Sequence, residues 1–171
     1  MRTQDLDHQL EFLAETSGFI KSLTANLTET ELTLKPSGRD FSCLEQVCHL
    51  RDIEREGYSG RIQRILKEVE PLLPNIDGDQ LAIERNYNSQ NLKAALDEFA
   101  SARKRNLEIV RSASTDALTR TAILEDVGTI TFEHLIIMMY EHDQEHRQQL
   151  SNLTTRFKAR VEGLSSQAEL K

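Results

Sequence analysis

The amino-acid sequence predicts an all-α protein, a four-helix bundle with long inter-helix connections, and three observations point to this fold class. Apolar residues recur three, four or seven positions apart along extended stretches, which is typical of amphipathic helices. Only 7 glycines and 3 prolines occur in 171 residues, so little interrupts these stretches. Four amphipathic helices must pack against one another to bury their apolar faces, and a bundle achieves this.

The first two helices are predicted from an apolar stripe and a capping motif. The first helix ends near Asn26–Thr28, and a turn at Leu32–Asp40 follows it. Its stripe consists of Leu6, Leu10, Leu13, Ile20, Leu23 and Leu27. The second helix runs from about Ser42 to Val69, because Ser42 and Glu45 form a capping box at its start.

The third helix follows a long excursion that contains Pro71 and Pro74. A connection of this length is unusual in a compact bundle unless it is functional or crosses the end of the bundle. Ser89 is the expected N-cap of the third helix, which stops near Ser112–Thr115.

A short extended segment precedes the fourth helix. This segment covers Ala122–Ile130 and is broken at Gly128. Thr131 is the expected N-cap of the fourth helix, which reaches roughly Arg156.

Size and composition fit a single domain, with the bundle at residues 1–157 and a polar tail at 158–171. The chain has 21 Lys+Arg and 28 Asp+Glu, so its formal net charge is −7. Because an acidic protein offers phosphates no overall attraction, and no run of basic residues offsets this charge, we expect no nucleic-acid partner.

The sequence predicts a soluble, cytoplasmic protein. Its N-terminus lacks the continuous apolar segment of a secretory signal. The longest apolar run, Leu135–Tyr140, is far shorter than the ~20 residues of a membrane span, so no membrane association is expected. Cys43 and Cys48 lie five positions apart on one predicted helix, outside disulfide geometry, and reduced thiols are typical of the cytosol.

The fourth helix carries the chemically informative feature, two histidines on its apolar stripe. His142 and His146 stand at positions i and i+4, where Cβ atoms are ~6 Å apart, so both imidazoles can bind one metal ion. Each histidine alone would equally fit a hydrogen-bonded core residue. His8 and His134 are weaker candidates, since His134 lies ~12 Å along the helix axis from His142. The stripe is Leu135, Met139, His142, His146, Leu150, Leu153 and Phe157.

A third candidate ligand, His49, lies on the second helix. Three imidazoles with one open coordination position are the pattern of a catalytic zinc-type site. His49 is not on the apolar stripe of its helix, however, and instead shares a face with Ile53 and Glu56. The second helix is therefore either buried on two sides or bent before Tyr58.

Both halves of this pattern resemble the DinB-like family. The motif on the second helix is Phe41-Ser42, then Val47-Cys48-His49-Leu50, then Asp52 and Glu54. The motif on the last helix is Gly128-Thr129-Ile130-Thr131, then Leu135, then His142-Asp143-x-x-His146-x-x-Gln149-Leu150. The family usually has tryptophan where this chain has Phe41. The resemblance covers nearly the whole chain and implies a four-helix bundle of DinB-like type.

The resemblance implies that His49, His142 and His146 together hold one divalent metal ion, with water in the open positions. It identifies no catalytic residue. Imidazole suits zinc, nickel and iron alike, so the identity of the metal stays open. Characterised members of the family include thiol-dependent S-transferases and a thiol-dependent isomerase, in which the metal lowers the pKa of a small-molecule thiol.

Three functions follow as hypotheses. The first is a metal-dependent S-transferase that uses a low-molecular-weight thiol and an electrophilic small-molecule substrate. The alternatives are a metal-dependent hydrolase that activates water, and a non-catalytic stress-response or binding module with a vestigial metal site. The resemblance, together with Phe12 and Phe19 outside the stripe of the first helix, also predicts a homodimer.

Several polar residues near the histidines have a functional and a structural interpretation. Four carboxylates either accept the free N–H of His49 or face solvent: Glu45, Asp52, Glu54 and Glu56. Arg103 and Tyr87 resemble positions often filled alike in relatives, which makes them candidates for the mouth of a pocket. Cys48 is either a redox or ligand thiol or a small core residue.

Overall fold

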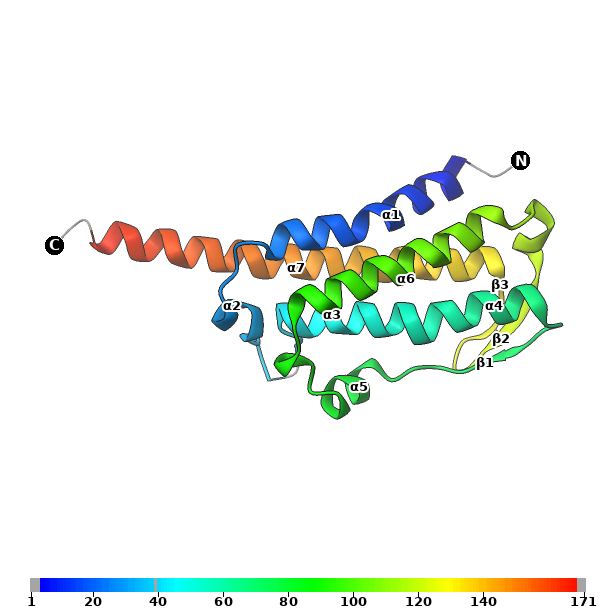
Figure 1. Ribbon diagram of the computed structural model, residues 1–171, viewed down its shortest axis with the longest axis horizontal. Helices are drawn as coiled ribbons and strands as arrows, with labels where there is room; N and C mark the ends of the chain where they lie inside the picture. Colours follow the sequence, from blue (N-terminus) through cyan, green and yellow to red (C-terminus); the bar gives the residue numbers. More distant parts are fainter. Residues whose placement is uncertain (1–3, 39, 169–171) are drawn as a thin grey trace.

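The four-helix bundle is confirmed by the computed structural model, which describes residues 4–38 and 40–168 (Figure 1). Its four long helical stretches are α1 (Gln4–Thr24), the continuous run α3 (Cys43–Asp52), η1 (Ile53–Tyr58) and α4 (Ser59–Lys67), then α6 (Leu92–Ser112) and α7 (Phe132–Ala168). The shorter helices are α2 (Glu29–Thr33), α5 (Gly78–Glu84), η2 (Tyr87–Ser89) and η3 (Thr115–Thr119).

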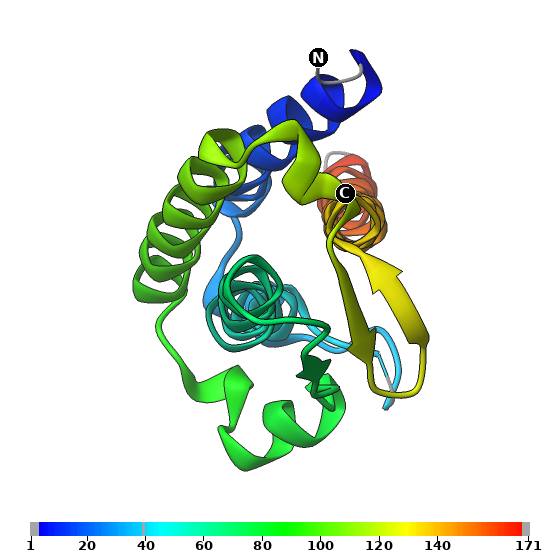
Figure 2. The ribbon, with the colours of Figure 1, turned by 90° about the vertical axis from the view of Figure 1, so that its right-hand side faces the viewer.

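The order of helix directions explains the long excursion. In Figure 1 the α3–α4 run and α6 point the same way, whereas α1 and α7 point the opposite way. After α4 the chain must therefore return along the bundle before α6 can start. Residues 68–91 make this return and place α5 outside the α3–α4 run, as Figure 2 shows from the end of the bundle.

A small sheet closes the end of the bundle where α7 begins. It contains β1 (Leu72–Leu73), β2 (Thr121–Leu124) and β3 (Gly128–Thr131) in that spatial order. Leu72 pairs with Ile123 in parallel, and β2 and β3 form an antiparallel hairpin. The expected extended segment is thus confirmed as this hairpin, in which Gly128 adopts a φ of 99° that side chains rarely tolerate. The sequence did not predict β1.

Local capping signals predicted two helix starts correctly and one incorrectly. Ser42 Oγ accepts the N–H of Glu45 in the expected capping box, and Thr131 Oγ1 accepts the N–H of His134. The expectation that Ser89 caps the third helix was wrong: Asn91 is the N-cap of α6, and its Oδ1 accepts the N–H of Ala94. Ser89 instead ends the short 3₁₀ turn η2.

The last helix extends further than predicted. The fourth helix was expected to reach roughly Arg156, yet α7 continues to Ala168 and projects beyond the other helices in Figure 1. The predicted tail at 158–171 therefore begins inside this helix, and residues 169–171 lie outside the described residues. None of the helices in the described part of the chain is both long and apolar enough to cross a bilayer.

A π-helical segment resolves the conflicting faces of the second predicted helix. In η1 the N–H of Ser59 donates to the carbonyl of Glu54, five residues earlier, which inserts one residue into the helical turn. The insertion rotates α4 relative to α3. His49 and Tyr58 are therefore both directed into the bundle, although an uninterrupted α-helix would place them on different faces.

Two apolar clusters form the core on either side of the histidines. The first contains Leu13, Ile62, Ile65, Phe132 and Leu135, all fully buried. The second contains Ile20, Val47, Tyr87, Phe99 and Leu150, which are also fully buried. Because both clusters consist of packed side chains alone, the bundle has a core that does not depend on a bound metal.

The two phenylalanines outside the stripe of α1 have partners within the chain. The guanidinium of Arg147 on α7 stacks on both rings, with its carbon 4.0 Å from the centroid of Phe12 and 4.1 Å from that of Phe19. Tyr140 also packs edge-on against Phe12 at 4.8 Å between centroids. Packing between α1 and α7 thus accounts for both residues.

Candidate metal centre

The fold brings together the three histidines that the sequence singled out. His49 comes from α3, and His142 and His146 come from successive turns of α7. One nitrogen from each ring forms a group in which all members lie within 4.8 Å of one another, and the Nε2 atoms of His49 and His142 are 3.1 Å apart. Two nitrogens bound at ~2.1 Å to a tetrahedral cation are about 3.4 Å apart, so small shifts would fit such an ion.

Burial keeps these imidazoles neutral, which is the protonation state that binds metals. Removal from water is the largest influence on each ring, and it lowers the pKa of His49 to about 4. It lowers the pKa of His142 to about 3 and that of His146 to about 2, with the neighbouring histidines adding to the effect. Above pH 5 all three rings therefore offer a lone pair.

The outward-facing nitrogens of the rings differ in their surroundings. Gln46 Oε1 lies 3.2 Å from His146 Nδ1, which directs Nε2 of that ring towards the other histidines. Among the described residues the Nδ1 atoms of His49 and His142 are buried without a hydrogen-bond partner. Gln46 precedes His49 by three residues on one helical face, so the spacing could have identified it.

A glycine packs directly against His49. Gly78 begins α5, and a Cβ added to it would lie 2.6 Å from His49 Nδ1 and even closer to Cε1. No real Cβ approaches a ring so closely, so only glycine fits unless the ring or α5 moves. The excursion between α4 and α6 therefore provides one wall of the site.

The carboxylates near His49 do not accept its N–H and have other roles. Glu45 completes the capping box of α3, and Glu56 pairs with Arg85. Asp52 is fully buried and accepts hydrogen bonds from Arg51, Arg85 and Tyr87. Burial alone would raise the pKa of Asp52, but these hydrogen bonds hold it below its usual value. This cluster fastens the segment after α5 to α3.

A second buried cluster lies next to the two histidines of α7. Arg103 on α6 donates to Asp143 at 2.5 and 3.0 Å and to Glu54 of η1 at 2.8 Å. Asn106 also donates to Glu54, at 2.7 Å. All four side chains are almost completely buried. The suggestion that Arg103 and Tyr87 line a pocket mouth was wrong, because both are buried in these polar clusters.

The protein's two cysteine thiols are buried and protonated. Cys43 and Cys48 are both free and fully buried. Burial raises the pKa of each thiol to about 11, so both are protonated at neutral pH. His8 and His134, the weaker candidates, are exposed on the surface away from the cluster.

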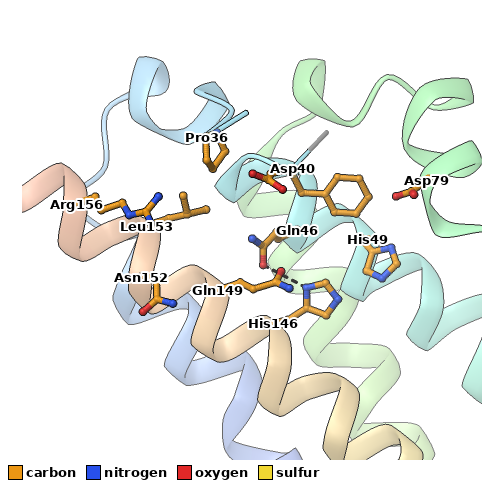
Figure 3. Close-up of a pocket in the computed structure, with 11 residues that line it drawn as sticks. Pro36, Asp40, Gln46, His49, Asp79, His146, Gln149, Asn152, Leu153 and Arg156 are labelled. Carbon is orange, nitrogen blue, oxygen red and sulfur yellow. Dashed lines mark hydrogen bonds between the residues drawn. The ribbon is translucent and has the colours of Figure 1, made fainter. Parts of the chain in front are cut away.

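The histidines open into a cavity of about 450 Å³, shown in Figure 3. His49 and His146 form one part of its wall, with Gln46 and Phe41 beside them. From there the cavity follows α7 past Gln149 to Arg156. The sequence pattern identified the histidines but not this extension, which depends on loops that approach from other parts of the chain.

Comparison with known proteins supports the fold and identifies the family. YfiT from Bacillus subtilis, described as a probable metal-dependent hydrolase with an unusual four-helix bundle topology, matches this structure with a TM-score of 0.85. The match covers 92% of this chain and 90% of that chain at 18% sequence identity, which shows a common fold. A search of curated proteins found no significant match. The sequence profile of the DinB superfamily matches residues 18–150, well over half of the chain. The chain therefore belongs to the DinB superfamily.

Proposed function

We propose that this protein is a metal-dependent enzyme that activates a small nucleophile, and that His49, His142 and His146 are its metal ligands. The observation that carries this proposal is the convergence of three neutral imidazoles from two helices, two of which, His49 and His146, line a cavity. A bound divalent cation would supply Lewis acidity, lowering the pKa of a thiol or water that coordinates it. Zinc, nickel and iron all accept such a ligand set.

The protein's residues hold this site in place. Gln46 fixes the ring orientation of His146, and Gly78 limits the movement of His49. Asp143, between the two α7 histidines, is tied to α6 by Arg103. Among the described residues no carboxylate is part of the histidine group, so the ligands would leave the full charge of the cation available to a substrate.

We favour transfer of a small thiol to an electrophile as the reaction. Because Cys43 and Cys48 are buried and protonated, neither supplies the nucleophile, so the thiol must be a separate molecule. The cavity of about 450 Å³ has room for such a molecule beside the histidines. Hydrolysis is the second candidate, favoured by the structural similarity to YfiT, which is described as a probable metal-dependent hydrolase.

A parallel assay separates these reactions. Metal-loaded protein is incubated with 1-chloro-2,4-dinitrobenzene plus cysteine or glutathione, and separately with p-nitrophenyl esters in the absence of thiol. We expect thiol conjugation that disappears on chelation, returns with added metal and persists in His134→Ala. Ester hydrolysis without conjugation would favour the hydrolase. Metal-loaded protein inactive in both assays would favour a non-catalytic binding module.

We further propose that the enzyme is a cytoplasmic homodimer. Two free, buried cysteines fit a reducing compartment. The dimer rests on the family resemblance alone. Phe12 and Phe19 do not add to it, because both rings already pack against Arg147 of the same chain. Light scattering at micromolar concentration tests it, and a mass near 19.6 kDa would contradict the dimer.

A further inference from the structure

The cavity beside the histidines is elongated along α7. His146, Gln149, Leu153 and Arg156 line it in succession on one side of that helix. Ten residues separate His146 from Arg156, which is about 15 Å along the helix axis. Because side chains lean towards the N-terminus of a helix, the arginine head can reach back to within about 10 Å of the histidines.

Arg156 at the far end has no ionic partner among the described residues. Buried Arg103 and half-buried Arg85 both have carboxylate partners. Arg156 has no such contact, although it borders the cavity and is exposed to it (Figure 3). A guanidinium in this setting is suited to a bidentate contact with a carboxylate or phosphate.

The charges elsewhere in the cavity restrict where an anion can bind. Asp79 lies beside His49 at the opposite end from Arg156, and Asp40 lies between the two ends (Figure 3). Gln149 and Asn152 provide neutral polar groups along α7. An anionic group on a bound molecule is therefore repelled by the acids near His49 and the middle of the cavity and attracted at Arg156.

We propose that the substrate is an elongated small molecule whose reactive group meets the histidines and whose other end is a carboxylate or phosphate bound by Arg156. This inference rests on the proposed metal centre, because it requires the reactive end to lie there. It assigns Arg156 a role in substrate binding. It also requires the middle of the molecule to be neutral or cationic, since Asp40 lies beside it.

Binding of matched probes to metal-loaded protein tests the proposal by calorimetry. Octanedioate carries a carboxylate for the metal and a second one at the distance of Arg156, octanoate lacks the second, and 7-phosphonoheptanoate replaces it with a phosphonate. We expect octanedioate or the phosphonate to bind roughly three- to tenfold more tightly than octanoate. Arg156→Gln should remove this preference. Lys158→Gln, the matched control, should retain it because Lys158 does not line this cavity.

The outcomes distinguish this inference from the proposed function. A preference for the phosphonate over octanedioate identifies a phosphate group, and the reverse identifies a carboxylate. Metal-loaded protein that binds all three probes equally, or keeps its preference in Arg156→Gln, would overturn the role of Arg156. Protein that binds no metal, yet binds octanoate in a manner that depends on Arg156, would overturn the metal centre alone.

Discussion

At the scale of single residues, the candidate site depends on one glycine as much as on its three histidines. Gly78 lies against the ring of His49, whose Nδ1 has no hydrogen-bond partner among the described residues. On its Nδ1 side, packing rather than hydrogen bonding therefore restrains this imidazole. The other two histidines are held differently, since both belong to one rigid helix and Gln46 orients His146.

Replacement of Gly78 by alanine should weaken metal binding by at least about tenfold, because the new Cβ displaces the ring of His49. The measurement is competition with a chelator of known affinity. Gly60→Ala is the matched control, since a Cβ at Gly60 would meet no atom within 4 Å apart from its chain neighbours and the backbone of its own helix. Equal affinities for the two variants would show that Gly78 does not position His49.

The neutral histidines should make the metal-free protein sensitive to acid. Their pKa values in the folded state are about 2 to 4, below the ~6.5 of an unfolded chain, so the unfolded state binds more protons as pH falls below 6.5. The free energy of unfolding should therefore fall by up to about 2 kcal/mol per histidine between pH 7 and pH 5.

Urea denaturation of metal-free protein at several pH values measures this effect. The His146→Leu variant should lose less stability on acidification than the wild type, because one of the three groups is gone. His134→Leu, at an exposed position, serves as the control. An identical dependence on pH in the wild type and His146→Leu would contradict the assignment of a neutral, buried His146.

At the scale of helices, buried ionic groups join the elements that carry the histidines. Arg103 of α6 binds both Glu54 of η1 and Asp143 of α7. Replacing Arg103 by methionine would leave two buried carboxylates unpaired, so we expect a loss of about 3 to 5 kcal/mol in unfolding free energy. Lys93→Met, which removes a cation from an exposed pair with Asp97, should change stability little. Similar stabilities of the two variants would contradict a structural role for Arg103.

The sequence predicted correctly those helix starts that are determined by residues close together in the chain. The capping box at Ser42 depends on residues three positions apart, so it could be read directly. Ser89 and Asn91 are both good N-caps two residues apart, and only the chain path through η2 decides between them. The short strand Leu72–Leu73 exists because it pairs with β2, about 50 residues later, which no local pattern reveals.

In the candidate site, too, features set by local helical geometry could be predicted, whereas features set by the path of the chain could not. The spacing of His142 and His146 on one helix follows from helical geometry alone. His49 does not lie on the apolar stripe of its own helix. This mismatch indicated an irregularity in the helix but did not show that a π-helical segment lies at Ile53–Tyr58. Gly78 and Arg156 carried no signal in the sequence, because their roles depend on the path of the excursion and on the length of α7.

At the scale of the whole molecule, the bundle should fold without its metal. Two apolar clusters flank the histidines and consist of fully packed side chains. Removing metal with a chelator should therefore leave far-ultraviolet circular dichroism nearly unchanged at neutral pH, unlike the behaviour of a zinc finger. A chelated protein that loses its helical signal would show that the metal is structural.

The central claim is that His49, His142 and His146 bind one divalent metal ion, and elemental analysis of purified, untagged protein tests it most directly. We predict about one equivalent of metal per chain in the wild type and a large loss in each of His49→Ala, His142→Ala and His146→Ala. The His134→Ala variant, altered on the surface of the same helix, should retain its metal. Full metal content in His142→Ala and His146→Ala, or loss of metal in His134→Ala, would contradict the claim.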